Sequence, residues 1–165
     1  MPRITLILHN IRSSHNVGSI FRSAEGFGVE KIIITGFTPY PSIENDSRLP
    51  HVRDKIASQI HKTALGAERL VPFEQYDTID DWLKHNDAHE RLPLVALEQD
   101  KRSVTLADYP ASPALALLLG EEVNGIDPEL LGICSAIIEI PMHGKKESFN
   151  VSVATGIALY ALSSQ

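Results

Sequence analysis

Cysteine is nearly absent from this chain, which holds Cys134 and no other among its 165 residues. A single thiol excludes an internal disulfide and any metal site made of cysteines alone, and it favours an intracellular, reducing setting. The seven histidines lack metal-ligand spacing, so we expect no metal. Met1 leads into a short alternating segment and not into an apolar leader. We therefore expect a cytoplasmic protein.

Several signature loops are missing as well. The chain has neither the G-x-G-x-x-G fingerprint of dinucleotide-binding folds nor a Walker phosphate loop. No G-x-S-x-G elbow surrounds any serine, which leaves little support for a hydrolase of that type. A nucleotide-binding oxidoreductase is supported only by the general α/β pattern of the chain.

Positive charge is in deficit, since 15 Lys and Arg face 21 Asp and Glu, for a formal net charge of −6. This balance argues against a protein coated in basic surface. Basic side chains nevertheless gather between Arg48 and Lys62, where Arg53 and Lys55 are also found and Asp54 is the only acid. A local basic patch and an ordinary solvated helix face explain this stretch equally well.

What is present is the alternating pattern of an α/β domain. Residues 3–8 and 31–35 are apolar runs that predict buried strands, and a helix capped by Ser14 or Asn16 and ended by Gly28 is expected between them. Strand, helix and strand over so short a distance predict a parallel pair. Further strands are expected at residues 69–73, 94–97, 114–119 and 136–140, and further helices at 52–65, 78–86 and 127–131.

These elements amount to about six strands and five helices in alternation, which predicts a mainly parallel sheet flanked by helices. The chain is 43% hydrophobic, and its length suits one well-packed domain better than two. We therefore expect residues 1–165 to form a single domain.

The C-terminal segment from Ser148 onward carries no charged side chain. Its apolar residues cover most of a helical circumference, which predicts a helix buried on more than one side. The many hydroxyl groups and Asn150 argue against a membrane span. An ordinary core helix explains the second half of the segment, but not Ser148 and Asn150 on either side of Phe149, directly after a Gly-Lys-Lys turn. A ligand site at the start of this helix is therefore plausible.

Three loops follow predicted strands and hold the unusual polar residues of the chain, at residues 16–22, 120–125 and 141–150. Since the carboxyl ends of parallel strands meet at one edge of a sheet, these loops are expected to face one crevice. Glu122 follows a buried strand and needs a partner, for which Arg22 is a natural choice. Gly18 leaves Arg22 free to point toward Asn16. The alternative is a surface arginine near a capping asparagine.

The same loops resemble the motifs of the SpoU/TrmH-type 2′-O-ribose RNA methyltransferases of the SPOUT superfamily. The matching stretches are Asn16-x-Gly18-x-x-x-Arg22, Leu119-Gly120-Glu121-Glu122-x-x-Gly125 and Ile140-Pro141-Met142-x-Gly144-x-x-x-Ser148-Phe149-Asn150-Val151-Ser152-Val153-Ala154. They cover nearly the whole chain, in order. Phe149 stands where leucine is common in the family, which is a conservative change.

The resemblance implies a fold whose C-terminal part forms a trefoil knot, an exception to the rule that chains are unknotted. It also implies a homodimer that methylates a ribose 2′-hydroxyl of tRNA or rRNA, with S-adenosylmethionine as the methyl donor. No separate N-terminal RNA-binding domain is expected, so RNA would be bound by this domain itself. The alternative is a non-catalytic RNA-binding or assembly module with the same fold.

The resemblance also implies the site residues. The expected catalytic residues are Asn16, Arg22, Glu122, Ser148 and Asn150. The cofactor is expected to contact loop backbone around Leu97, Gly120, Ile140, Met142 and Phe149. Candidates for contacts with RNA phosphates are Arg48, Arg53, Lys55, Lys62, Lys145 and Lys146. In this scheme Arg22 acts as a transient base or stabilises the developing alkoxide, and Glu122 and Asn16 orient it.

Overall fold

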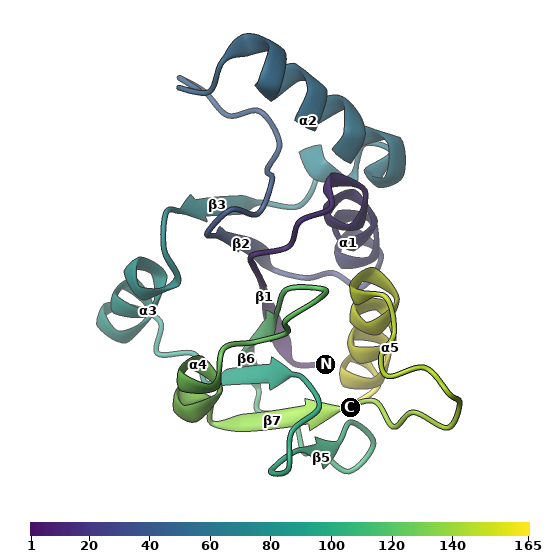
Figure 1. Ribbon diagram of the computed structural model, residues 1–165. Helices are drawn as coiled ribbons and strands as arrows, with labels where there is room; N and C mark the ends of the chain where they lie inside the picture. Colours follow the sequence, from purple (N-terminus) through teal and green to yellow (C-terminus); the bar gives the residue numbers. More distant parts are fainter.

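The computed structural model describes all of residues 1–165, folded around one seven-stranded sheet in which every strand pair is parallel. The strands lie in the order β3-β2-β1-β6-β4-β7-β5. Helices cover both faces (Figure 1), with α1, α2 and α5 on one side and α3 and α4 on the other. The predicted α/β architecture is confirmed. The knot implied by the resemblance stays a prediction.

The strands are β1 (Arg3–His9), β2 (Lys31–Thr35), β3 (Phe73–Tyr76), β4 (Leu94–Leu97), β5 (Val104–Thr105), β6 (Ala114–Leu119) and β7 (Ala136–Glu139). The helices are α1 (Ser14–Gly26), α2 (Pro50–Ala64), α3 (Ile79–Ala88), α4 (Pro128–Ile133) and α5 (Val151–Ser163), with a short 3-10 helix, η1, at Ala67–Arg69.

The central strands are buried on both faces, which explains their continuous apolar runs. Successive side chains of a strand point to opposite faces of the sheet. In β1, Leu6 and Leu8 therefore pack in the larger core beneath α1 and α5, whereas Ile7 packs with Trp82 and Leu131 in the smaller core beneath α3 and α4. One strand thus supplies both cores, as expected for a parallel sheet covered on each side.

One prediction of secondary structure was wrong around residues 65–76, and one short strand elsewhere was missed. The expected strand at 69–73 is replaced by η1 and then by β3, which begins at Phe73. Leu65 ends α2 in the left-handed conformation with φ 52°, and Gly66 follows at φ 101°, so the chain turns before it can extend. The two-residue strand β5 was missed because so short a segment has no readable alternation.

Helix α1 lies between α2 and α5 and begins at a different cap from the one expected. Ser13 is the N-cap, and its hydroxyl accepts a hydrogen bond from the backbone N–H of Asn16 at 3.2 Å. The side chain of Asn16 is therefore free for other contacts. At the other end of the helix Gly28 adopts φ 64°, as predicted.

Helix α5 is less buried than its composition predicted. Thr155, Ala158, Leu159 and Leu162 are buried against the sheet and α1. Val153 and Tyr160, however, are 50% and 67% exposed, so one apolar side of the helix faces outward. None of the helices combines the length and the apolar composition that crossing a membrane requires.

Gly18 sets how closely α1 and α2 pack. A Cβ atom at this position would lie 2.2 Å from both the Ile60 carbonyl oxygen and the Thr63 hydroxyl. Thr63 also donates a hydrogen bond to the His15 carbonyl at 2.7 Å. The absent side chain therefore makes room for α2, and not for Arg22 as the sequence suggested.

Gly18→Ala is expected to lower the free energy of unfolding by about 1–3 kcal/mol, because the added methyl group forces α1 and α2 apart. Gly26→Ala is the matched control: it lies in the same helix, with nothing within 4 Å of the new Cβ. The control should be neutral or stabilise by less than about 1 kcal/mol. Urea unfolding of the two variants measures the difference, and equal midpoints would contradict the packing argument.

Candidate functional site

The three predicted loops meet at the carboxyl edge of the sheet, where hydrogen bonds join them. The Asn16 side-chain amide donates to Glu122 Oε1 at 3.1 Å, and Asn150 donates its own amide to Asn16 Oδ1 at 3.2 Å. Each side chain is placed by a different element: Asn16 lies in the first turn of α1, Glu122 follows β6, and Asn150 is the N-cap of α5. The prediction that these loops meet at one edge of the sheet is confirmed for these three residues.

Glu122 is held as a carboxylate. The backbone N–H groups of Arg12 and Ser13 donate to its two oxygens at 3.1 and 3.4 Å, in addition to the bond from Asn16. Burial alone would raise the pKa of Glu122, but these hydrogen bonds outweigh burial and hold the pKa below its usual value. The group is therefore ionised at neutral pH and serves as an acceptor.

Arg22 does not pair with Glu122 within the chain, and this expectation was wrong. Glu122 is already satisfied by two backbone N–H groups and by Asn16. Arg22 lies six residues beyond Asn16 on α1, which is about 9 Å along a helix axis. Its side chain is exposed, and no acid in the chain pairs with it.

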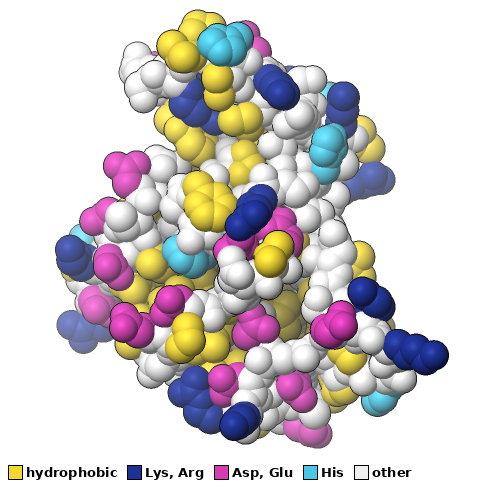
Figure 2. Space-filling view, in the orientation of Figure 1, with side chains coloured by type: hydrophobic (Ala, Val, Ile, Leu, Met, Phe, Trp, Pro, Cys, Tyr) yellow, Lys and Arg dark blue, Asp and Glu magenta, His cyan; other side chains and the backbone are white.

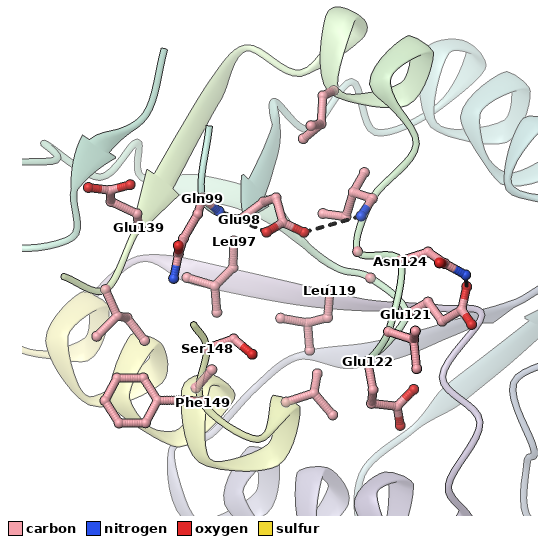
Figure 3. A pocket seen from close by; sticks show the side chains of 18 residues that line it. Leu97, Glu98, Gln99, Leu119, Glu121, Glu122, Asn124, Glu139, Ser148 and Phe149 are labelled. Carbon is pink, nitrogen blue, oxygen red and sulfur yellow. Dashed lines mark hydrogen bonds between the residues drawn. The ribbon is translucent and has the colours of Figure 1, made fainter. Parts of the chain in front are cut away.

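A cavity of about 360 Å³ opens beside these residues (Figure 3). Its walls come from the ends of β4, β6 and β7 and from the start of α5. Among the expected cofactor residues, Leu97, Gly120, Ile140 and Phe149 line it, whereas Met142 does not. Glu122 and Ser148 line it too. The cavity has a size typical of small-molecule sites.

Glycines shape the loop after β6 that forms one wall of the cavity. Gly125 adopts φ 69°, a left-handed conformation that favours glycine. A Cβ atom there would lie 2.4 Å from Glu98 Oε2, and one at Gly120 would lie 2.9 Å from the Gly125 carbonyl oxygen. The Glu98 carboxylate accepts from the backbone N–H of Ile126 at 3.2 Å and so fixes the end of this loop.

The sequence interpretation missed four charged residues of the site: Glu98, Glu121, Glu139 and Arg12. Glu98 directly follows β4, so the rule that selected the other loops would have found it. Glu121 forms an ion pair with the Arg12 guanidinium, and the Asn124 amide donates to its other oxygen at 3.0 Å. Arg12 thus ties the segment before α1 to the loop after β6.

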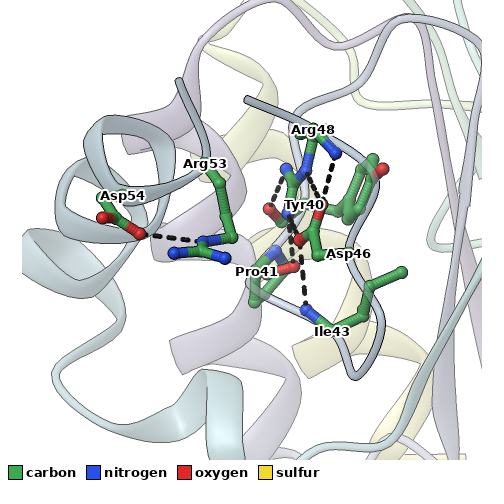
Figure 4. Close-up of polar contacts among 7 residues, drawn as sticks. All are labelled: Tyr40, Pro41, Ile43, Asp46, Arg48, Arg53 and Asp54. Carbon is green, nitrogen blue, oxygen red and sulfur yellow. Dashed lines mark hydrogen bonds and ion pairs between the residues drawn. The ribbon is translucent and has the colours of Figure 1, made fainter. Parts of the chain in front are cut away.

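Among the expected RNA contacts, Arg48 has a different role in the chain (Figure 4). Its guanidinium lies 3.7 Å from the centre of the Tyr40 ring. It donates to the carbonyls of Tyr40 and Pro41 at 2.9 and 3.1 Å and to both carboxylate oxygens of Asp46. This pairing holds the pKa of Asp46 well below its usual range. Arg48 therefore orders the loop before α2.

The other basic candidates lie at the surface. Lys55 and Lys62 are exposed on α2, and Lys145 and Lys146 are exposed in the loop between β7 and α5. Arg53 is paired with Asp54 at 2.8 Å. Figure 2 shows Lys and Arg groups over α2 and on the protruding loop at the lower right, while acidic groups are frequent over α3.

Comparison with known proteins agrees with this arrangement. Residues 3–160 match the SpoU rRNA Methylase family. The chain is 30% identical over 157 residues to a 23S rRNA (guanosine-2′-O-)-methyltransferase of Acinetobacter baylyi, covering 95% of this chain and 58% of that protein. The chain spans 55–59% of the length of the curated relatives it matches first.

Solved structures have the same fold. The TrmH/SpoU tRNA modifying enzyme of A. aeolicus superposes with a TM-score of 0.78 at 26% identity, over 100% of this chain and 76% of that one. An AdoMet-bound rRNA methyltransferase from Sinorhizobium meliloti also gives a TM-score of 0.78, at 24% identity, over 96% of this chain and 55% of that one. With a family match over nearly its full length and the same fold in these structures, the chain belongs to the SpoU rRNA methylase family.

Proposed function

We propose that this protein transfers a methyl group from S-adenosylmethionine to a ribose 2′-hydroxyl of RNA. One observation carries the proposal: Asn16, Glu122 and Asn150, from three distant segments, are joined by hydrogen bonds at the rim of one cavity. The names of the relatives, which act on ribosomal or transfer RNA, support the same reaction and substrate class.

The cavity suits the proposed methyl donor. Its walls combine apolar groups, such as Leu97, Leu119 and Phe149, with backbone from the glycine loop and with carboxylates. Apolar walls suit an adenosine ring, and carboxylates suit the cationic end of the donor. When bound, S-adenosylmethionine supplies a methyl group already activated on a sulfonium. Leu97, Gly120, Ile140 and Phe149 are the proposed residues around it.

The protein's own task is then to align the ribose oxygen and stabilise the charge that develops on it. The carboxylate of Glu122 fixes the amide of Asn16, and Asn16 in turn fixes Asn150. We assign Ser148 and Asn150 to holding the start of α5 against the cavity. Arg22 is the proposed base or stabiliser of the alkoxide, and its exposed guanidinium is available for a ligand from outside the chain.

A homodimer is proposed on the outward side of α5. Val153 and Tyr160 are 50% and 67% exposed and lie seven residues, or about two turns, apart on this helix, and Phe149, which directly precedes the helix cap, is 42% exposed. The Tyr160 ring also contacts Phe27 of α1 at 6.5 Å between centroids, so the apolar surface continues toward α1. A second copy docked there would lie near Arg22, and we propose that Arg22 acts on the site of the partner.

Replacing Arg22 with alanine is expected to reduce the methylation rate by about 10²–10³-fold, because a positive charge at the reacting oxygen is lost. Binding of S-adenosylmethionine should stay unchanged, since Arg22 does not line the cavity. Transfer of labelled methyl groups to RNA and calorimetric titration of the donor measure the two effects. Wild-type turnover in Arg22→Ala would refute the assignment.

A mixed dimer tests whether Arg22 acts on the site of its own chain or on the site of the partner. Arg22→Ala and Glu122→Gln protomers, each inactive alone, are co-expressed with different tags. If Arg22 serves the partner, one site of the mixed dimer has both native groups, and about half of the wild-type activity returns. If both groups serve the same chain, no activity returns, and the proposed arrangement is wrong.

Val153→Asp is expected to convert the protein to a monomer, because a carboxylate on this face is left without solvent or partner at the interface. Leu70→Asp is the matched control, since Leu70 is 69% exposed and directly follows η1, away from α5. Sedimentation or light scattering measures the mass. A dimer that persists in Val153→Asp places the interface elsewhere.

The double change Lys55→Glu and Lys62→Glu is expected to weaken RNA binding and to reduce the slope of log affinity against log salt by about 1–2, since up to two phosphate contacts are lost. Lys84→Glu with Arg91→Glu changes the net charge equally, but at α3 and just beyond it. Binding isotherms at several salt concentrations test this. Equal losses of RNA affinity in both double variants would indicate that net charge alone matters and that α2 is not a contact surface for RNA.

A further inference from the structure

The cavity is unusual in the sign of its charge. Four carboxylates, of Glu98, Glu121, Glu122 and Glu139, are among its 18 lining residues, and no Lys, Arg or His is. Figure 3 shows Glu98 between Glu139 at one end of the cavity and Glu122 at the other. A partly enclosed site with several acids and no base favours a cationic ligand.

The partners of these four carboxylates show how much of their negative charge is left without a nearby positive charge. Glu121 is paired with Arg12. The other three are held by neutral donors: Glu98 by the backbone N–H groups of Gln99 and Ile126 at 2.8 and 3.2 Å, Glu139 by the Ser103 hydroxyl at 2.6 Å, and Glu122 by the bonds described above. Neutral donors fix a carboxylate in place without cancelling its charge, so three negative charges face the cavity uncompensated.

We propose that the carboxylates of Glu98 and Glu139 make this cavity selective for the cationic methyl donor over its own neutral product. The inference rests on the proposed function. The donor carries a sulfonium, an ammonium and a carboxylate, for a net charge of +1. In transfer, the methyl carbon bonds to the ribose oxygen, the hydroxyl proton passes to Arg22 as base or to water, and sulfur keeps the electron pair of the broken bond.

The product is therefore a neutral thioether that differs from the donor by one methyl group and one charge. The cavity can hardly distinguish donor from product by shape, because both molecules have the same adenosine and amino-acid portions. A charge does separate them: a single pair at contact distance changes affinity by about fivefold even with water-like screening, and by more in a less polar site. The cavity thus binds the donor and releases the product after each transfer.

The test is the ratio of two dissociation constants. Calorimetric titration of wild type and Glu98→Gln uses S-adenosylmethionine, S-adenosylhomocysteine and sinefungin, an analogue with an amine in place of the methylated sulfur. Glu98→Gln should weaken the two cationic ligands about fivefold or more and the neutral product by less than about twofold. Glu129→Gln, an exposed acid on α4 outside the cavity, should change none of them.

Glu98 also fixes the loop at Ile126, so Glu98→Gln could act by removing a charge or by loosening this loop. A second variant distinguishes the two effects. Glu139→Gln leaves that hydrogen bond intact and should produce the same selective loss. Equal weakening of all three ligands in both variants would overturn the proposal, and so would unchanged affinities. If the wild-type protein binds neither donor nor product, the proposed function itself fails, which is a different result from an unchanged ratio.

Discussion

The hydrogen bonds from Asn150 to Asn16 and from Asn16 to Glu122 are the constraint on which the site depends. They join residues 134 and 106 positions apart in the chain. Only a parallel sheet brings the segments after β1, β6 and β7 to one edge, and its strand order, with β1 beside β6, places the first two next to each other. The fold thus performs the one task that local sequence cannot, which is to assemble a polar network from three separate loops.

The position of α1 makes this assembly rigid. The helix is packed closely against α2 through Gly18 and lies against α5 on its other side, where a Cβ atom at Gly156 would lie at an ordinary contact distance of 3.9 Å from the Ser23 hydroxyl. The contact with α2 depends on the missing side chain of Gly18, and with a helix on each side α1 has little room to shift. Because Asn16 lies in its first turn, with the backbone N–H bonded to Ser13, the geometry of the network follows from the packing of the whole helix.

The strands, which depend on burial and hydrophobic pattern, could be predicted from the sequence. The partners of charged side chains could not be predicted where those partners are backbone groups. The strands β1, β2, β4 and β6 are predominantly apolar because both faces of the sheet are covered, and the sequence placed them closely. The pairing of Arg22 with Glu122 was wrong because backbone N–H groups of residues 12 and 13 satisfy the carboxylate, and no side-chain motif reveals them. Arg48 was grouped with surface lysines for a similar reason, since two of its partners are backbone carbonyls and the third, the Asp46 carboxylate, lies in the same loop.

The separation of charge on this acidic protein fits the proposed RNA substrate. With a net charge of −6, the molecule as a whole repels a polyanion, so the proposed function assigns the attraction of RNA to local groups such as the lysines of α2 and of the loop after β7. The cavity carries the opposite sign, which keeps phosphate groups out of the space that the small cation is proposed to enter. In the proposed function, RNA and the methyl donor are drawn to neighbouring places by opposite fields, and the ribose oxygen meets the methyl group where the two fields adjoin.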